Sequence, residues 1–329
     1  MWKRIELHNH TIESDGLMTV KELVSYLNDQ NIHAFSLTDH NTVSGWPALP
    51  EACSGLPETM EFIKGFELTS YYGHMLCQNL AFSIPWDDID ETCADTLIRR
   101  VHAAGGLAGP AHPFSVPAPF SNGMRWTMRI RDYNLVDFVE IINNAHSMEP
   151  DNREAVLWWA KLILSGFSIA PVSGLDLHRP VCMDGFYTTY IQVKEEDLTL
   201  PLSIQLDHAV RSCCTCVTRG PVPDWRLGEE GISLFLCNPE GETETGIVPS
   251  DSGSPALGIP PVSQSPALIC QIRTADQTAE FPMKAGTCFI PFTSLHSPLK
   301  AAVFLIFEEK PEMERLVAAA RPLLTQQGI

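Results

Sequence analysis

The sequence has no run of about 18 apolar residues, so we expect no membrane-spanning helix and no membrane partner. Positive charge is also scarce, because 22 lysines and arginines stand against 40 aspartates and glutamates, which gives a net charge of −18. A surface this acidic argues against long nucleic acid as a partner. A phosphate-bearing substrate would then need local positive charge, and metal ions are the obvious source. Residues 1–6 lack the apolar segment of a signal peptide, so we expect a cytoplasmic protein.

The ten cysteines lack the spacing of a zinc-finger-like site. Their densest group, Cys213, Cys214 and Cys216, has no second Cys or His pair at a suitable distance in the chain. In a cytoplasmic protein such thiols are expected to be reduced and packed in the core. The hydrophobic fraction of 44% and the charged fraction of 19% predict a globular chain rather than a disordered one.

Two histidines stand one residue apart close to the start of the chain, in the stretch Ile5–His10. This stretch has the pattern of a short strand. Side chains at positions i and i+2 of a strand point to the same face. His8 and His10 could therefore reach one metal ion from a rigid support.

Strand-like and helix-like segments alternate over the first 180 residues. A capping box at Thr19–Glu22 predicts a helix from about Thr19 to Gln30, and strands are expected at 34–37 and 61–67. This alternation predicts a β/α barrel spanning residues 1–180. Residues 181–329 differ: they predict a β-rich accessory region, with a Pro/Gly/Ser-rich loop over 238–266 and a C-terminal helix at Pro311–Leu323.

Imidazole and carboxylate side chains collect at the expected ends of strands in the first part of the chain. Each of these residues, taken alone, is more often structural than functional. Together they form a mixed nitrogen and oxygen set that suits zinc, manganese or iron, and nine ligands exceed what a single ion needs. The sequence therefore predicts a site for two or three divalent ions, with these ligands: His8, His10, Asp15, His40, Glu67, His74, His112, Asp176 and His178.

The motifs His8-Asn9-His10, Asp15-Gly16, Thr38-Asp39-His40, Gly65-Phe66-Glu67, Ala111-His112-Pro113 and Asp176-Leu177-His178, with His74, resemble the signature set of the PHP (polymerase and histidinol phosphatase) superfamily. The resemblance covers about 180 residues in the family's order. It implies a distorted (β/α)7 barrel that binds two or three divalent ions. A short tail segment, His208–Arg211 with Val217–Pro221, is weakly similar to CehA/McbA-type PHP hydrolases.

The resemblance also implies how the ligands divide among the ions. His8, His10, Glu67 and Asp176 would hold the first ion; Glu67, His74 and His112 the second; and Asp15, His40 and His178 a third. Asp15 stands where the histidinol-phosphatase branch tends to have histidine, and in this respect the sequence resembles the stand-alone nucleotide phosphoesterase branch instead. Leu175 replaces a residue that is commonly small.

These features predict a metal-dependent phosphoesterase that cleaves a small phosphomonoester or a nucleotide with a hydroxide bridging two ions. Glu67, Asp176 and His178 are the expected catalytic residues. Arg125 and Arg179 are the expected substrate contacts, because a guanidinium fork suits phosphate. Asp39 and Glu140 are expected to orient ligand imidazoles. Two alternatives stay open: a carboxylic or carbamic ester hydrolase using the same ions, and a non-catalytic metal-binding PHP module.

Overall fold

The computed structural model describes residues 1–56, 59–116, 122–146, 150–238, 266–296 and 299–325. The fold is mixed α/β. Five helices are present in these residues: α1 Val20–Asp29, α2 Leu49–Cys53, α3 Ala94–Ala103, α4 Pro150–Leu164 and α5 Leu202–Arg211. The first half holds the strands β1 Trp2–Ile5, β2 Ala34–Leu37, β3 Glu61–Lys64, β4 Phe66–Ser70, β5 Gly73–Gln78, β6 Leu107–Pro110, β7 Phe138–Asn143 and β8 Ala170–Gly174.

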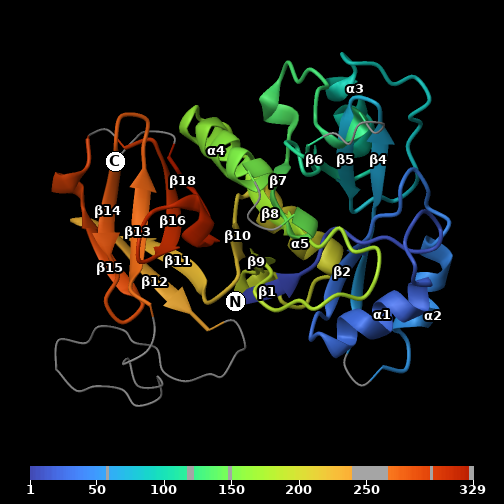
Figure 1. Cartoon of the computed structure of the whole chain (residues 1–329), viewed down its shortest axis with the longest axis horizontal. Helices are drawn as coiled ribbons and strands as arrows, with labels where there is room; N and C mark the ends of the chain where they lie inside the picture. The colour runs from blue at the N-terminus through green and yellow to red at the C-terminus, as the bar shows by residue number, and fades with distance from the viewer. Residues whose placement is uncertain (57–58, 117–121, 147–149, 239–265, 297–298, 326–329) are drawn as a thin grey trace.

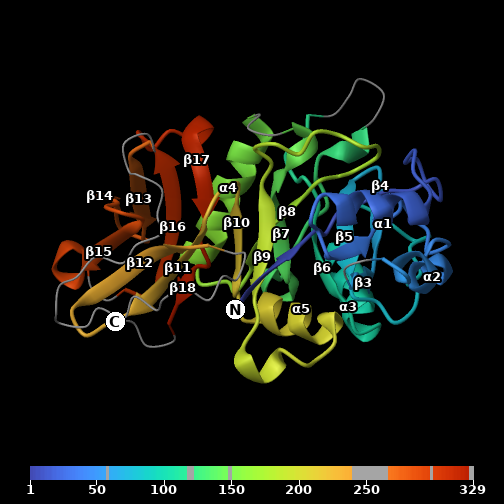
Figure 2. The same cartoon turned by 90° about the horizontal axis from the view of Figure 1, so that it is seen from below.

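The second half is almost entirely β. Its strands are β9 Thr188–Gln192, β10 Thr215–Thr218, β11 Val222–Leu227, β12 Gly231–Cys237, β13 Leu268–Arg273, β14 Thr278–Pro282, β15 Thr287–Pro291, β16 Ala301–Glu308, β17 Leu316–Ala319 and β18 Leu323–Leu324. Figures 1 and 2 show β11–β16 at one end of the molecule and α1–α3 at the other. The strands β1, β9 and β10 lie between the two ends.

The strands of the first half form short separate sheets. β2 pairs with β3 in parallel, β4-β5-β6 is antiparallel, and β7 pairs with β8 in parallel. Single bridges connect these sheets, at Glu6–Phe35, Asn9–Leu177 and His40–Glu67. Within the described residues no continuous ladder closes on itself, so a closed (β/α)7 barrel is not confirmed. The regular alternation fails at β4-β5-β6, because antiparallel neighbours need only a tight turn and no crossover helix.

The capping box predicted at Thr19 is confirmed. The Thr19 hydroxyl accepts a hydrogen bond from the Glu22 backbone N–H, and the Glu22 carboxylate accepts one from the Thr19 N–H. The predicted strand at 61–67 is interrupted at Gly65, where a Cβ atom would lie 2.7 Å from the Cys77 carbonyl oxygen. The predicted strand at Ile5–His10 is shorter than expected: β1 ends at Ile5, and both histidines lie in the extended segment that follows.

β1 has its ladder partner far along the chain. It pairs antiparallel with β9, with Trp2 opposite Gln192 and Ile5 opposite Thr189. Ile5 and Leu7 share a buried cluster with residues of β9 and α5, including Ile191 and Leu202. Residues after 180 therefore help to build the first half. The division at about residue 180 stays a prediction.

The C-terminal part contains two sheets that share a buried cluster. One is the far end of an eight-stranded sheet, ordered β1-β9-β10-β17-β16-β13-β14, with β18 beside β16; the other is β11-β12-β15. Their cluster includes Ile232, Ile272, Ile290 and Phe304. The β-rich character predicted for this part is what the structure contains. Most of the loop predicted over 238–266 lies outside the described residues.

The helix predicted at Pro311–Leu323 is wrong. Residues Met313–Arg315 form one 3-10 turn, and Leu316–Ala319 then form β17 between β10 and β16. Burial of all four β17 side chains between two strands overrides the helical spacing of the apolar residues. In the part of the chain that the structure describes, no helix is both long and apolar enough to cross a membrane.

Candidate metal centre

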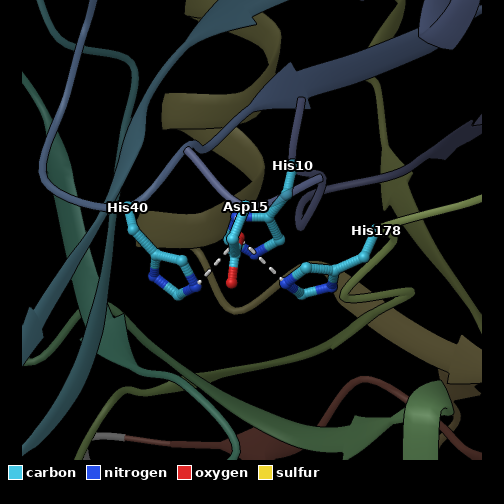
Figure 3. Close-up of side chains that lie close together, drawn as sticks. All are labelled: His10, Asp15, His40 and His178. Carbon is cyan, nitrogen blue, oxygen red and sulfur yellow. Dashed lines mark ion pairs between the residues drawn. The ribbon is translucent and has the colours of Figure 1, made fainter. Parts of the chain in front are cut away.

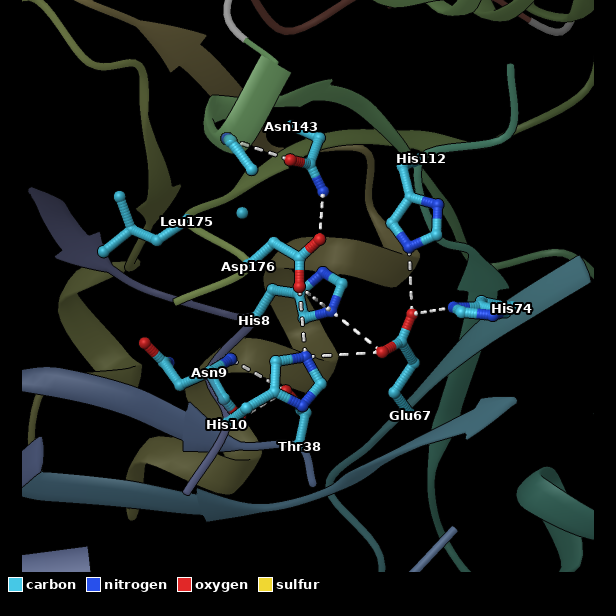
Figure 4. A network of polar contacts seen from close by, with 12 residues as sticks. His8, Asn9, His10, Thr38, Glu67, His74, His112, Asn143, Leu175 and Asp176 are labelled. Atoms are coloured by element: carbon cyan, nitrogen blue, oxygen red, sulfur yellow. Dashed lines mark hydrogen bonds and ion pairs between the residues drawn. The ribbon is translucent and has the colours of Figure 1, made fainter. Parts of the chain in front are cut away.

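Glu67 on β4 lies at the centre of a buried cluster of histidines (Figure 4). Its side chain is 0% exposed, and each carboxylate oxygen faces several imidazoles. Glu67 Oε2 lies 3.2 Å from His8 Nε2, 3.4 Å from His10 Nε2 and 2.9 Å from His40 Nδ1. Glu67 Oε1 lies 2.8 Å from His74 Nδ1 and 3.0 Å from His112 Nε2. One carboxylate thus joins five imidazoles, as a ligand bridging two ions would.

Asp176 closes the opposite side of the same cluster. Its Oδ1 lies 3.1 Å from His10 Nε2 and 3.4 Å from His8 Nε2. The backbone of Asp176 has a φ of 50°, in the left-handed region that residues other than glycine rarely adopt. His112 also has a positive φ, of 26°. Strain of this kind is typical of functional sites, where the surrounding structure holds a side chain in a required position.

A third group lies closer to the solvent (Figure 3). Asp15 Oδ1 is 3.2 Å from His178 Nε2, 3.6 Å from His40 Nε2 and 3.9 Å from His10 Nδ1. The Asp15 side chain is 58% exposed, in contrast to the fully buried Glu67. We call His10, Asp15, His40 and His178 the outer cluster.

Hydrogen bonds on the far side of several rings decide which nitrogen faces the centre. His8 Nδ1 lies 2.9 Å from Glu140 Oε1, His112 Nδ1 lies 3.2 Å from the Met124 carbonyl oxygen, and His178 Nδ1 lies 2.9 Å from the Asp176 carbonyl oxygen. These oxygens only accept, so Nδ1 carries the proton in each ring. When such a ring is neutral, its Nε2 has the lone pair directed toward the cluster, which is the arrangement of a metal-binding histidine.

Two buried glutamates support this geometry without joining a cluster. Glu140 on β7 contacts His8 and also accepts a hydrogen bond of 2.6 Å from the His112 backbone N–H. Glu6 accepts hydrogen bonds from the backbone N–H groups of His8 and Leu175. Burial raises the pKa of Glu6 to about 7, although these two hydrogen bonds lower it.

The electrostatics of the cluster indicate a place for positive charge. Burial raises the pKa of Glu67, but the imidazoles of His8 and His74 hold it well below its usual range. Burial also raises the pKa of Asp176, and His8 and His10 lower it more. Burial lowers the pKa of His8, yet the carboxylates of Asp176 and Glu67 raise it well above its ordinary value. Buried carboxylates at this density need either protonated imidazoles or cations between them.

The ligand atoms fit such cations. His8 Nε2, both ring nitrogens of His10 and Glu67 Oε2 are buried and have no hydrogen-bond partner. Buried polar atoms are normally paired, so these four atoms mark a place for a further group. Three sets of ligand atoms lie within 4.8 Å of one another: the outer cluster; His8, His10, Glu67 and Asp176; and His40, Glu67 and His74. We call the last two sets the inner clusters.

A comparison with protein families identifies the first part of the chain. Residues 6–117 match the family model of the PHP domain. The first part of the chain therefore contains a PHP domain. The matched range contains seven of the nine predicted ligands of the PHP site, and the other two, Asp176 and His178, lie beyond it.

The individual proteins to which this chain is similar are more distant. A segment of 67 residues is 33% identical to the 5′-3′ exoribonuclease Rnm of Salmonella typhimurium, covering 20% of this chain and 23% of that enzyme. The chain therefore matches less than a quarter of that enzyme's length.

A solved structure from Bacteroides vulgatus, described as a two-domain protein containing a predicted PHP-like metal-dependent phosphoesterase, aligns over 98% of this chain and 95% of that chain. Its TM-score is 0.54 at 17% identity, so the likeness is one of fold. A metal-dependent phosphoesterase structure from Bifidobacterium adolescentis, itself described as putative, covers 54% of this chain and 88% of that chain, with a TM-score of 0.37 at 18% identity.

The structure brings all nine predicted ligands of the PHP site together. Two of the three expected groupings appear as expected, except that His10 also belongs to the outer cluster. The second grouping differs: His40 joins Glu67 and His74, while His112 touches only the Glu67 Oε1 side, at 3.0 Å. His40 is shared because its Nδ1 faces Glu67 and its Nε2 faces Asp15.

Predictions for residues around the ligands have mixed outcomes. Glu140 orients a ligand imidazole, as expected. Asp39 was expected to do the same, but its carboxylate instead accepts hydrogen bonds from Thr11 and Ser14. Arg125 is held by an ion pair of 3.3 Å to Glu154, and its guanidinium lies 5.4 Å from the centroid of the Phe114 ring. A substrate would have to compete with both contacts.

Sequence reasoning missed two polar residues of the site. Asn143, the last residue of β7, donates a hydrogen bond of 3.1 Å from Nδ2 to Asp176 Oδ2. Thr69 on β4 contacts His40 Nδ1 through its hydroxyl, at 2.5 Å. Asn143 could have been found by the same signal as the ligands, a polar residue at the end of a buried strand. Thr69 carried no signal in the sequence.

Proposed function

We propose that this chain is a metal-dependent phosphoesterase that hydrolyses a small phosphomonoester or a nucleotide. The observation that carries the proposal is the set of buried, unpartnered ligand atoms around the shared Glu67 carboxylate. The PHP domain and the exoribonuclease relative support hydrolysis of a phosphate ester. A cytoplasmic location, and zinc, manganese or iron as the bound metal, are parts of the same proposal.

The charge balance of the site favours an anionic substrate. Glu67, Asp176 and Asp15 contribute three negative charges to the ligand sets. Two divalent ions would give the site a charge of about +1, and three would give about +3. A phosphate monoester carries about −2 at neutral pH, so it would neutralise most of that charge. The rest of the surface repels it, since the chain carries a net charge of −18.

The protein's own residues would fix the geometry of the reaction. The inner clusters would hold two ions, which supply Lewis-acid activation of water and of the phosphoryl oxygen when bound. Glu67 would contribute to both inner clusters, because its two oxygens face different imidazoles. His178 keeps its proton on Nδ1, through the hydrogen bond to the Asp176 carbonyl oxygen, and offers Nε2 at the outer, more exposed side. The leaving group would depart on that side.

Of the two arginines predicted to contact the substrate, Arg179 is the better candidate. It is exposed, follows His178 directly, and the structure records no ion pair for it among the described residues. Arg125 is less suited, because Glu154 already neutralises it. Replacing Arg179 by methionine should therefore raise the KM for a phosphomonoester more than the same change at Arg125.

The test of the proposed function compares aryl phosphates, nucleotides and aryl acetates after reloading with zinc, manganese or iron(II). Turnover of the phosphate esters should be much faster, and inorganic phosphate should inhibit competitively. Faster hydrolysis of aryl acetates, unaffected by Asp15→Asn, would replace the proposal with a carboxylic ester hydrolase. Metal binding without turnover of any of these esters would favour the non-catalytic module.

A further inference from the structure

Asp39 is a buried carboxylate that no metal cluster uses. Its side chain is 2% exposed. Oδ1 accepts hydrogen bonds from the Thr11 backbone N–H at 2.6 Å and from the Ser14 hydroxyl at 2.7 Å, and Oδ2 accepts one from the Thr11 hydroxyl at 2.8 Å. All three donors belong to the turn that carries Asp15. Hydrogen bonds to a charged carboxylate are the stronger kind, which suits a clamp on a short loop.

The same loop is fixed at its other end by a ligand of the outer cluster. The Leu17 backbone N–H donates a hydrogen bond of 2.6 Å to the His178 carbonyl oxygen. Between the two ends, Gly16 passes so close to His10 that a Cβ atom would lie 2.6 Å from the His10 carbonyl carbon and oxygen. The loop is therefore tied to Asp39, to His10 and to His178.

Asp39 also has a fixed relation to the remaining outer ligand. It immediately precedes His40, whose Nε2 lies 3.6 Å from Asp15 Oδ1. Thr11, which Asp39 holds, immediately follows His10. The clamp thus joins the two segments from which His10, Asp15 and His40 project. Asp15 needs such support because its side chain is 58% exposed and lies in a loop rather than on a strand.

We propose that Asp39 is a positioning residue for the outer cluster: its three hydrogen bonds hold Asp15 opposite His40 and His178, so that these residues can bind an ion. This inference rests on the proposed metal centre. The inner clusters contain neither Asp15 nor any other residue of the clamped loop after His10. His10 and His40 are shared with the inner clusters, but Glu67 also holds them there through its carboxylate. Loss of the clamp should therefore weaken the outer ion much more than the inner ions.

The test measures zinc binding by calorimetric titration of the metal-free full-length chain, with metal content after desalting as a second readout. Asp39→Ala should lower the affinity for the most weakly bound zinc by about 10- to 100-fold, the range typical of residues that orient metal ligands. The affinity for the other zinc ions should change much less. Asp39→Asn should restore most of the binding, because an amide oxygen can still accept from Thr11 and Ser14.

Asp137→Ala is the matched control. Asp137 is likewise buried, with 8% exposure, and its carboxylate takes three contacts: from the Ala108 N–H at 2.8 Å, His102 Nε2 at 2.7 Å and the Arg211 guanidinium at 3.3 Å. It belongs to no metal cluster. Asp137→Ala should lower the melting temperature and leave all zinc affinities unchanged. If Asp39→Ala does not fold, Ser14→Ala, which removes the 2.7 Å hydrogen bond, should still weaken the outer zinc severalfold.

Three results would overturn the inference: unchanged outer zinc affinity in Asp39→Ala, an equal loss in Asp137→Ala, or an Asp39→Asn variant as damaged as Asp39→Ala. The last result would assign the effect to charge instead of position. Failure of the proposed function looks different, since the wild-type protein itself would then bind no zinc or hydrolyse no phosphate ester.

Discussion

Replacing Glu67 by glutamine tests the central geometry of the site. Five imidazole nitrogens lie within 3.4 Å of its carboxylate. Both inner clusters contain Glu67, and only the outer cluster does without it. Glutamine keeps the volume of the side chain, but it removes one anionic oxygen and the negative charge that two cations would share. The change should therefore affect two ions at once.

The expected loss of metal follows from the number of clusters to which each residue belongs. If the wild-type protein holds about three ions, Glu67→Gln should retain about one, while Asp15→Asn, which touches only the outer cluster, should retain about two. Hydrolysis of a phosphate ester by Glu67→Gln should fall by at least about a thousandfold, or about 4 kcal/mol of transition-state stabilisation.

The assay is elemental analysis after purification without chelator, followed by steady-state kinetics. Circular dichroism controls for folding, since a misfolded variant would lose metal for a trivial reason. Equal metal content in Glu67→Gln and Asp15→Asn would refute the bridging role of Glu67. A wild-type content below about one ion per chain would refute the metal centre as a whole.

Three further predictions concern positions outside the ligand sets. Glu140→Gln replaces the carboxylate that lies 2.9 Å from His8 Nδ1, and it should weaken zinc binding at the inner clusters by about tenfold or more in a competition titration. Unchanged zinc affinity would mean that the His8 imidazole does not need the Glu140 carboxylate. Trp159→Ala should lower the free energy of unfolding by about 3–5 kcal/mol in chemical denaturation, because the Trp159 side chain is 0% exposed, and a loss below about 1 kcal/mol would show that the core repacks. Cys182 should react with an aromatic disulfide reagent at about pH 8 before Cys213 does, because Cys182 is exposed while burial raises the pKa of Cys213 to about 12. Equal labelling rates of the two cysteines, measured by mass spectrometry, would contradict this.

Residue order and chemistry were enough to pick out the nine side chains that the structure brings together. His8, His40 and Asp176 stand next to or just beyond buried strands, and a polar residue in such a place has few structural reasons to be there. The sharing of His40 between two clusters could not be found in this way, because it depends on the two ring nitrogens facing different carboxylates. The role of Asp39 depends on a turn whose path only the structure gives.

Local patterns predicted the first half of the fold better than the second. Thr19 and Glu22 determine where α1 begins through contacts three residues apart. Leu316–Ala319 become a strand because of β10 and β16, whose residues lie about 100 and 10 positions earlier in the chain. The (β/α)7 barrel is not confirmed, because β4 and β5 pair antiparallel through a tight turn where the apolar pattern predicted regular strand–helix alternation.

The pairing of β1 with β9 has a consequence for how the protein is made. His8 and His10 are synthesised long before residues 188–192, yet the strand just before these histidines gains its ladder partner only when residues 188–192 are present. In the described part of the chain β1 has no other ladder partner. A nascent chain that ends at residue 180 would already contain all nine predicted ligands, and Asn9 could bridge to Leu177, but β1 would still lack its ladder partner. The support beneath His8 and His10 is therefore expected to be completed only after all nine predicted ligands have been translated.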